Sequence, residues 1–406
     1  MQGDRPCPHC GQLIPIGHKE CPHCSKPKGW WTVERETLLL ASIVALVILF
    51  GITGVAANLY HSQRKELGQE WFAKGEINLK GGNAELALQD FRTALSYSPD
   101  SALYRLRLAQ SLIAANRPDE ARSHLLTLWR DEPGNSTVNL ELARLAAGRG
   151  DTSDAIRYFH NAIYGVWQSN PAQHRLRARL ELSEYLLQKN EKAQAQSELI
   201  ALADSLPEDA KLYTKVAEMF RQAEDRDRAL STYEKALKID RHEQAALTGA
   251  GETAFEMGDY RTAVSYLDRA VRLGAASDAD KSQLATARLA LSLDPMAPRL
   301  SRAEADRRTL NAYRIATSRL NDCLQARGLN PHPDQPQNDL QRLSLEALKL
   351  NSQAKSSALR RDPDLRVTMM DFVSSIEETT AKECGAPTGP DLALLLIARK
   401  HGAPEQ

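Results

Sequence analysis

The chain has 406 residues, of which 52 are basic and 52 are acidic, so its formal net charge at pH 7 is zero. A balanced charge gives no reason to expect nucleic acid or a polyanionic substrate as a partner. Aromatic residues make up only 6% of the chain, which favours packed helices over sandwiched strands and predicts an all-α fold.

The first 28 residues contain two C-P-H-C pairs with ten residues between them. Four thiolates at the ends of two tight knuckles are the ligand set that a tetrahedral Zn²⁺ prefers. Gly11 suits such a knuckle because glycine readily adopts a positive φ. The pattern therefore predicts a site for Zn²⁺, with iron or a pair of disulfides as the alternatives. The predicted ligands are Cys7, Cys10, Cys21 and Cys24.

The pattern resembles the small zinc ribbon found at the start of many bacterial membrane proteins, in which C-P-x-C-G and a second C-P-x-C recur. This sequence departs from that pattern at Ser25, where a second glycine is common. Because four thiolates fill a tetrahedral shell, we expect a structural or docking site over residues 1–28 rather than a catalytic one. The nearby His9, His18 and His23 are expected to be solvated.

Residues 37–59 form a run of 23 residues without a charge, and about 20 apolar residues suffice to cross a bilayer. The run predicts one transmembrane helix. A secretory signal is the alternative, because Val55, Ala56 and Ala57 resemble a cleavage site. A signal preceded by a folded metal knuckle would be unusual, which favours the membrane span.

Two features bear on the orientation of this helix. Lys and Arg are nearly even on its two sides, so the positive-inside rule favours a cytoplasmic N-terminus only slightly. Thiolates that hold zinc persist in a reducing cytosol, whereas the distant pair Cys323 and Cys384 suits an oxidising compartment. We therefore predict a single-pass protein of the bacterial inner membrane, with a cytoplasmic N-terminus and an extracytoplasmic C-terminal portion.

A 34-residue period follows the apolar run. Segments that begin at residues 68, 102, 136, 176, 210 and 244 share a small residue at position 8, alanine at position 20 and a large apolar residue at position 24. Small residues let two antiparallel helices approach closely, and the large residue fills the gap to the next helix pair. The residues at position 24 are Phe91, Leu125, Phe159, Leu199, Tyr233 and Leu267.

This pattern resembles the tetratricopeptide repeat. The first segment keeps Trp71, Gly75, Ala87, Phe91, Ala94 and Pro99 of the family motif. The resemblance implies an α-solenoid of about six helix–turn–helix repeats over residues 68–277. Residues 278–293 predict a final helix that covers the exposed apolar face of the last repeat, so the predicted repeat domain is 68–293.

The resemblance also implies that positions 5 and 9 of each first helix face a ligand-binding groove. The Lys and Asn clamp with which some members hold a terminal carboxylate is absent. Apolar and acidic residues at these positions favour an amphipathic or mildly basic polypeptide segment as the ligand, and a merely solvated face is the alternative. The candidate groove residues are Phe72, Glu76, Leu106, Gln110, Leu140, Arg144, Leu180, Glu184, Glu218 and Glu252.

The period ends at residues 294–298, and residues 299–402 predict four helices in a compact bundle. Cys323 and Cys384 each lie near the C-terminal end of a predicted helix, so a disulfide between them is geometrically feasible. It would close a loop of about sixty residues and add on the order of 3 to 4 kcal/mol to stability. Two separate buried thiols are the alternative.

The sequence contains no phosphate-binding glycine loop and no familiar hydrolase or metalloprotease motif, so we expect a binding protein and not an enzyme. We predict a membrane-anchored scaffold or adaptor for protein partners in cell-envelope assembly, secretion or export. The alternatives are a cytosol-facing membrane adaptor that recruits regulatory or proteolytic partners, and a sensor that uses the thiolate-bound metal. Neither nucleic acid nor a small-molecule substrate is expected.

Overall fold

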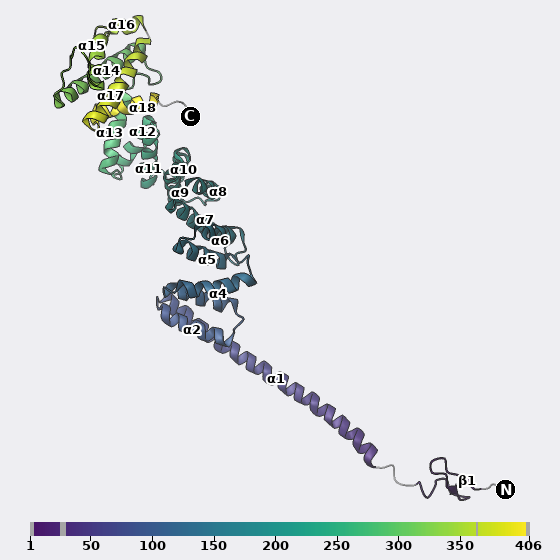
Figure 1. Cartoon of the computed structure of the whole chain (residues 1–406). Helices are drawn as coiled ribbons and strands as arrows, with labels where there is room; N and C mark the ends of the chain where they lie inside the picture. Colours follow the sequence, from purple (N-terminus) through teal and green to yellow (C-terminus); the bar gives the residue numbers. More distant parts are fainter. Residues whose placement is uncertain (1–3, 25–29, 363, 403–406) are drawn as a thin grey trace. The chain divides into compact units, whose positions relative to one another are not determined.

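A computed structural model describes residues 4–24, 30–362 and 364–402. Residues 1–3 and 25–28 of the predicted ribbon therefore lie outside the described residues. The chain divides into two compact units, Met1–Gly148 and Arg149–Gln406. Apart from two strands of two residues each, the regular elements of the described chain are α-helices (Figure 1), so the predicted fold class is confirmed.

The first unit begins with two short strands, β1 (Arg5–Pro6) and β2 (Leu13–Ile14). They pair antiparallel, with Arg5 opposite Ile14. The helices that follow are α1 (Trp30–Lys80), α2 (Ala84–Tyr97), α3 (Ala102–Ala114), α4 (Pro118–Asp131) and α5 (Ser136–Arg149).

The 51-residue helix α1 joins two predicted elements. It contains the apolar run 37–59 and continues without a break into the first helix of the first repeat. Among the described residues it is the one helix long and apolar enough to cross a membrane, and none of its apolar window is buried. Phe50, for example, is 74% exposed. The C-terminal end of α1 packs against α2 (Figure 1).

The repeat positions pack as the sequence predicts. The six alanines at position 20 are fully buried, and the large residues at position 24 are at most 2% exposed. In the first repeat a Cβ on Gly75 would lie 2.7 Å from the Phe91 ring. In the sixth, a Cβ on Gly251 would lie 2.6 Å from Leu267. The small residue at position 8 is therefore required by the large residue at position 24 of the same repeat.

The second unit also contains helix pairs. Its first eight helices are α6 (Thr152–Tyr164), α7 (Pro171–Gln188), α8 (Lys192–Ala203), α9 (Ala210–Gln222), α10 (Arg226–Ile239), α11 (Gln244–Glu256), α12 (Tyr260–Arg272) and α13 (Asp278–Leu293). Helix α13 packs on α12, as expected of a helix that covers the last repeat. It begins with a capping box, in which Ser277 and Asp280 each accept a hydrogen bond from the backbone N–H of the other.

The C-terminal part of this unit contains α14 (Arg302–Ala326), α15 (Asp339–Asn351), α16 (Ser356–Arg361), α17 (Asp364–Cys384) and α18 (Gly389–Gly402). Four of these match the predicted bundle helices, and α16 is an additional six-residue helix. The outer face of α13 packs against α18. As a result, Ala263 of α12, Ala290 of α13 and Leu394 of α18 share one hydrophobic core.

Candidate functional sites

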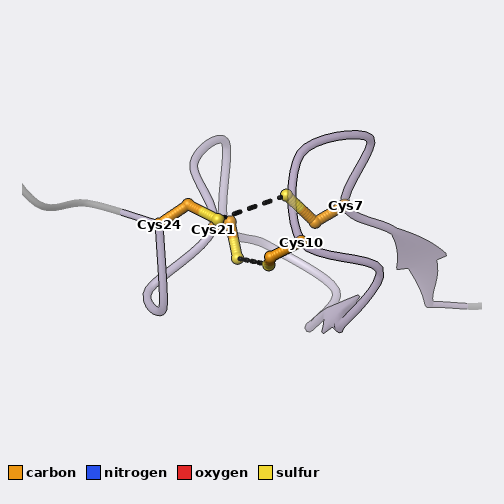
Figure 2. A group of neighbouring side chains, drawn as sticks. All are labelled: Cys7, Cys10, Cys21 and Cys24. Atoms are coloured by element: carbon orange, nitrogen blue, oxygen red, sulfur yellow. Dashed lines mark hydrogen bonds between the residues drawn. The ribbon is translucent and has the colours of Figure 1, made fainter.

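The four N-terminal cysteines converge on one point (Figure 2). Their sulfur atoms all lie within 4.8 Å of one another, and none forms a disulfide. The sulfurs of Cys7 and Cys24 are 3.8 Å apart, and those of Cys10 and Cys21 are 3.7 Å apart. Four sulfurs bound to Zn²⁺ at about 2.3 Å would define a tetrahedron with edges of about 3.8 Å. The donor set and its size therefore fit a tetrahedral metal ion.

The backbone of the first knuckle is arranged around the Cys7 sulfur. Gly11 adopts a φ of +73° and donates its N–H to the carbonyl of Cys7 at 2.9 Å. The backbone N–H of His9 points at the sulfur from 3.4 Å. Hydrogen bonds from the N–H groups of His9 and Cys10 lower the pKa of Cys7 to about 6. The knuckle thus favours the thiolate, which is the form that binds metal.

In three of the repeats the residue at position 9 contacts the residue at position 6 of the next repeat, a register that the sequence pattern did not predict. In the first unit Glu76 forms an ion pair with Arg107 at 2.6 Å. One repeat further on, the side-chain amide of Gln110 donates to Glu141 at 2.9 Å. Two candidate groove residues therefore hold neighbouring repeats together.

The same register recurs in the second unit. Glu184 at position 9 pairs with Lys215 at position 6, with 2.5 Å between nitrogen and oxygen. Between the fifth and sixth repeats, position 6 is Gly249, which has no side chain. The hydroxyl group of Tyr233 occupies the space that a side chain would fill there. It donates to Glu218 at 2.8 Å. A Cβ on Gly249 would lie 2.6 Å from that hydroxyl oxygen.

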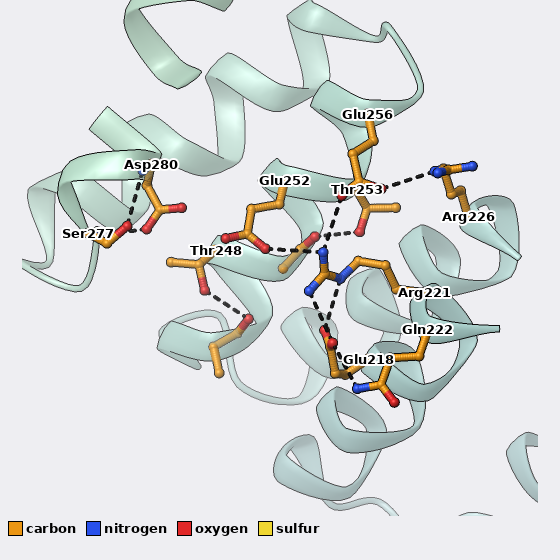
Figure 3. A network of polar contacts seen from close by, with 12 residues as sticks. Glu218, Arg221, Gln222, Arg226, Thr248, Glu252, Thr253, Glu256, Ser277 and Asp280 are labelled. Atoms are coloured by element: carbon orange, nitrogen blue, oxygen red, sulfur yellow. Dashed lines mark hydrogen bonds and ion pairs between the residues drawn. The ribbon is translucent and has the colours of Figure 1, made fainter. Parts of the chain in front are cut away.

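Arg221 is the centre of a charged network on α9, α10 and α11 (Figure 3). Its Nε and Nη2 atoms donate to the two carboxylate oxygens of Glu218 at 3.0 and 3.1 Å. Its Nη1 atom donates to Glu256 at 3.2 Å, and Arg226 donates to the other oxygen of Glu256 at 3.0 Å. Burial alone would raise the pKa of Glu218, but hydrogen bonds from Arg221 and Tyr233 outweigh it and lower that pKa. The Glu218 carboxylate is therefore internally neutralised.

Several position-5 residues also take part in packing. The ring of Phe72 stacks on Tyr104 with 4.7 Å between centroids. Leu140 is buried, whereas Leu106 and Leu180 are half-buried. Arg144, at position 9 of the third repeat, forms an ion pair with Glu141 at 3.4 Å. The role of these residues in ligand binding remains a prediction.

In the C-terminal helices, Cys323 and Cys384 form a disulfide with 5.8 Å between their Cα atoms. The bond joins the C-terminal ends of α14 and α17. Arg319, one turn before Cys323, donates to Thr380 of α17 at 2.8 Å and lies 3.6 Å from Glu377. The side chain of Glu377 is fully buried. Burial, together with the charge of the nearby Asp391, raises its pKa to about 8.

Comparison with known proteins identifies the repeats. Residues 79–145 and residues 212–247 match two models of the tetratricopeptide repeat. Both ranges lie within the predicted repeat region, so the chain contains tetratricopeptide repeats. No curated protein matches the chain.

Solved structures similar to this chain include pilF of Pseudomonas aeruginosa, at 20% identity over 53% of this chain and 95% of that chain, with a TM-score of 0.39. MamA of Desulfovibrio magneticus RS-1 is also 20% identical, over 44% of this chain and 98% of that chain, with a TM-score of 0.34. The C-terminal part of a tetratricopeptide repeat protein from Cytophaga hutchinsonii is 14% identical over 68% of this chain and 99% of that chain, with a TM-score of 0.43. These likenesses concern the fold alone.

Proposed function

We propose that the protein is a single-pass membrane scaffold whose tetratricopeptide repeats bind protein or peptide segments in cell-envelope assembly, secretion or export. The observation that carries this proposal is helix α1. The described residues bury none of its apolar window, and exposed apolar surface of this extent is favourable in lipid and costly in water. The same helix supplies the first helix of the first repeat, which would hold the array at the membrane.

The four-cysteine site supports the proposed orientation. The spacing of its sulfurs fits Zn²⁺, which would be the main source of folding free energy for so small a segment. Free thiolates persist in a reducing compartment, while the Cys323–Cys384 disulfide is favoured by an oxidising one. Both features support a cytoplasmic N-terminus and extracytoplasmic repeats. The second candidate function, a cytosol-facing adaptor, reverses this topology and would place the disulfide in the reducing cytosol and the free thiolates in the oxidising compartment.

Reporter fusions test the orientation. In a bacterial host, alkaline phosphatase fused after Gln406 is expected to be active, and a green fluorescent protein that matures only in the cytosol is expected to be dark there. The same reporters fused before Met1 should give the opposite result. Fluorescence from the C-terminal fusion would contradict the proposal and support the cytosol-facing adaptor.

Cross-linking tests the binding role. A photoreactive amino acid at Leu180, a half-buried candidate groove position, is expected to cross-link to one defined partner in intact cells. The matched control carries it at Lys238, which is exposed on the second helix of a repeat, and should not give that product. Equal products from both positions, or none from any groove position, would contradict a partner-binding groove.

A further inference from the structure

The contact between position 9 and position 6 changes at the end of the array. Glu252 of α11 occupies position 9 of the sixth repeat, and its position-6 counterpart is Gln283 of α13. At the corresponding place Glu76 meets Arg107 and Glu184 meets Lys215. Gln283 supplies no positive charge. Its amide oxygen is buried and has no hydrogen-bond partner among the described residues.

A second acceptor without a donor lies beside Glu252. Asp280 of α13 is only 3% exposed. One of its carboxylate oxygens accepts the backbone N–H of Ser277 at 2.7 Å. The other, Oδ1, is buried without a partner in the described part of the chain. Figure 3 shows the carboxylates of Asp280, on α13, and Glu252, on α11, pointing toward each other. An acceptor left unsatisfied in this way destabilises the fold.

The nearby arginine only partly offsets the negative charge at this place. Arg221 forms a long ion pair with Glu252 at 3.7 Å, while its three nitrogens also donate to Glu218 and Glu256. Four carboxylates, those of Glu218, Glu252, Glu256 and Asp280, stand against the two guanidinium groups of Arg221 and Arg226. Burial and the proximity of Asp280 accordingly raise the pKa of Glu252. One further positive charge would reproduce the arrangement in which Glu76 pairs with Arg107 and Glu184 pairs with Lys215.

We propose that Glu252, Asp280 and Gln283 form a binding site for a lysine ammonium group of the polypeptide held in the groove. An ammonium group has three donors and no acceptor, which matches the Glu252 carboxylate, Asp280 Oδ1 and Gln283 Oε1. Its four-carbon stem is flexible and carries the charge away from the peptide backbone. The Glu252 side chain is 31% exposed, whereas Asp280 is buried. This inference rests on the proposed function, whose ligand it specifies.

A bound metal ion is disfavoured as the occupant. Among the described residues the one set of side chains with the spacing of metal ligands is the four-cysteine group. A proton shared between Glu252 and Asp280 is the remaining competitor. It would satisfy the same oxygens without any ligand, so the experiment must separate a proton from an ammonium group.

The test uses the full chain in detergent at about pH 8, where an exposed lysine is charged and an exposed carboxyl is not protonated. The probe is the fluorescent peptide Gly-Leu-Ala-Lys-Ala-Leu-Gly, and binding is measured by anisotropy. The comparison peptide carries Nε-acetyl-lysine, which has no charge. We expect the lysine peptide to bind at least tenfold more tightly than the acetylated one, since hydrogen bonds from a charged donor are stronger than those from a neutral one.

Two variants locate the site. Glu252→Gln is expected to remove the preference for lysine over acetyl-lysine. Gln283→Lys places an ammonium group where Lys215 stands in the fourth interface, so it should abolish that preference and raise the melting temperature. A rise in melting temperature excludes misfolding as the cause of lost binding. Glu184→Gln, whose partner cation is internal, is the matched control and should keep the preference.

Equal binding of the two peptides, or no binding of the lysine peptide up to about 1 mM, would overturn the inference and leave the shared proton as the explanation. A Gln283→Lys variant that keeps the preference would also overturn it. The cross-linking from Leu180 described above reports on the proposed function separately. A partner captured equally by wild type and Glu252→Gln would leave the scaffold role standing while the lysine site fails.

Discussion

Gly249 and Tyr233 show how a single residue determines an interface between repeats. The Tyr233 hydroxyl occupies the space that a side chain at position 249 would need and donates to Glu218. Burial, followed by the charge of Glu218, raises the pKa of Tyr233, so this hydroxyl keeps its proton and remains a donor. The glycine is required by packing rather than by its backbone conformation.

We predict that Gly249→Ala destabilises the protein by roughly 1 to 3 kcal/mol, as overpacking of a close contact does. The midpoint of thermal unfolding, followed by circular dichroism, would fall. Gly148→Ala is the matched control, because Gly148 is also helical and a Cβ there meets nothing within 4 Å. Alanine should be neutral or stabilising at that position by up to about 1 kcal/mol. Equal midpoints for the two variants would refute the packing argument.

A second prediction concerns single residues of the cysteine site. Cys10→Ser removes one of four thiolates and should lower bound zinc from about one ion per chain to well below that, because a hydroxyl is a poor zinc ligand at neutral pH. Elemental analysis of the purified chain after dialysis measures the ratio. His9→Ala changes an exposed neighbour and should keep the metal. Full zinc content in Cys10→Ser would show that these thiolates are not the ligand set.

The residues that could be predicted from the sequence are those whose partners recur at a fixed spacing. Ala87 and Phe91 were assigned correctly because positions 20 and 24 pack within their own repeat. The role of Glu184 was not foreseen, since its partner Lys215 lies in the next repeat at a position without a common residue type. Aligning position 9 with the following position 6 would have revealed the opposite charges. The contact of Arg319 with Glu377 follows no period and required the structure.

Among the helices, α14 and α17 are joined by both a covalent bond and a buried polar group. The Cys323–Cys384 disulfide closes one end of this pair. Glu377 of α17 lies one turn below Thr380, and neither of its carboxyl oxygens has a hydrogen-bond partner among the described residues. A buried carboxyl of this kind favours its neutral form.

This arrangement predicts that stability depends on pH. Glu377 has a folded-state pKa of about 8 against 4.5 for the exposed group. The fold therefore favours the neutral form of Glu377. Its contribution to the free energy of unfolding is complete below pH 4.5 and is lost as the pH rises through about 8. In the wild type, the midpoint temperature of unfolding should decrease as the pH rises from 4.5 to about 8. Glu377→Gln should make this decrease smaller. Glu378→Gln changes an exposed neighbour and should leave the decrease unaltered. An equal effect of the two substitutions would contradict the role assigned to Glu377.

Helix α1 shows that two segments predicted separately can form one continuous helix. The apolar run and the first repeat helix were predicted separately because their compositions differ. No proline separates them, and the intervening residues 60–67 form helix readily, so the backbone continues. At 1.5 Å per residue, 51 residues span about 76 Å.

For the whole molecule, the proposed anchor makes a prediction about partitioning. A chain that lacks residues 1–59 should appear in the soluble fraction after cell lysis, because it loses the exposed apolar surface and keeps the buried repeat core. A chain that lacks only residues 1–28 keeps α1 and should remain with the membranes. Circular dichroism of the shorter chain checks that it is still helical. Recovery of a folded 60–406 chain in the membrane fraction would refute α1 as the anchor.

The uninterrupted backbone of α1 has a mechanical consequence. An α-helix without a hinge resists twisting, so torque applied to its apolar half would rotate Phe72 and Gly75 by a similar angle. Those two residues touch Phe91 and Tyr104, which belong to α2 and α3. Turning or tilting the N-terminal half would therefore strain the first two repeats directly, with no flexible linker to absorb the motion.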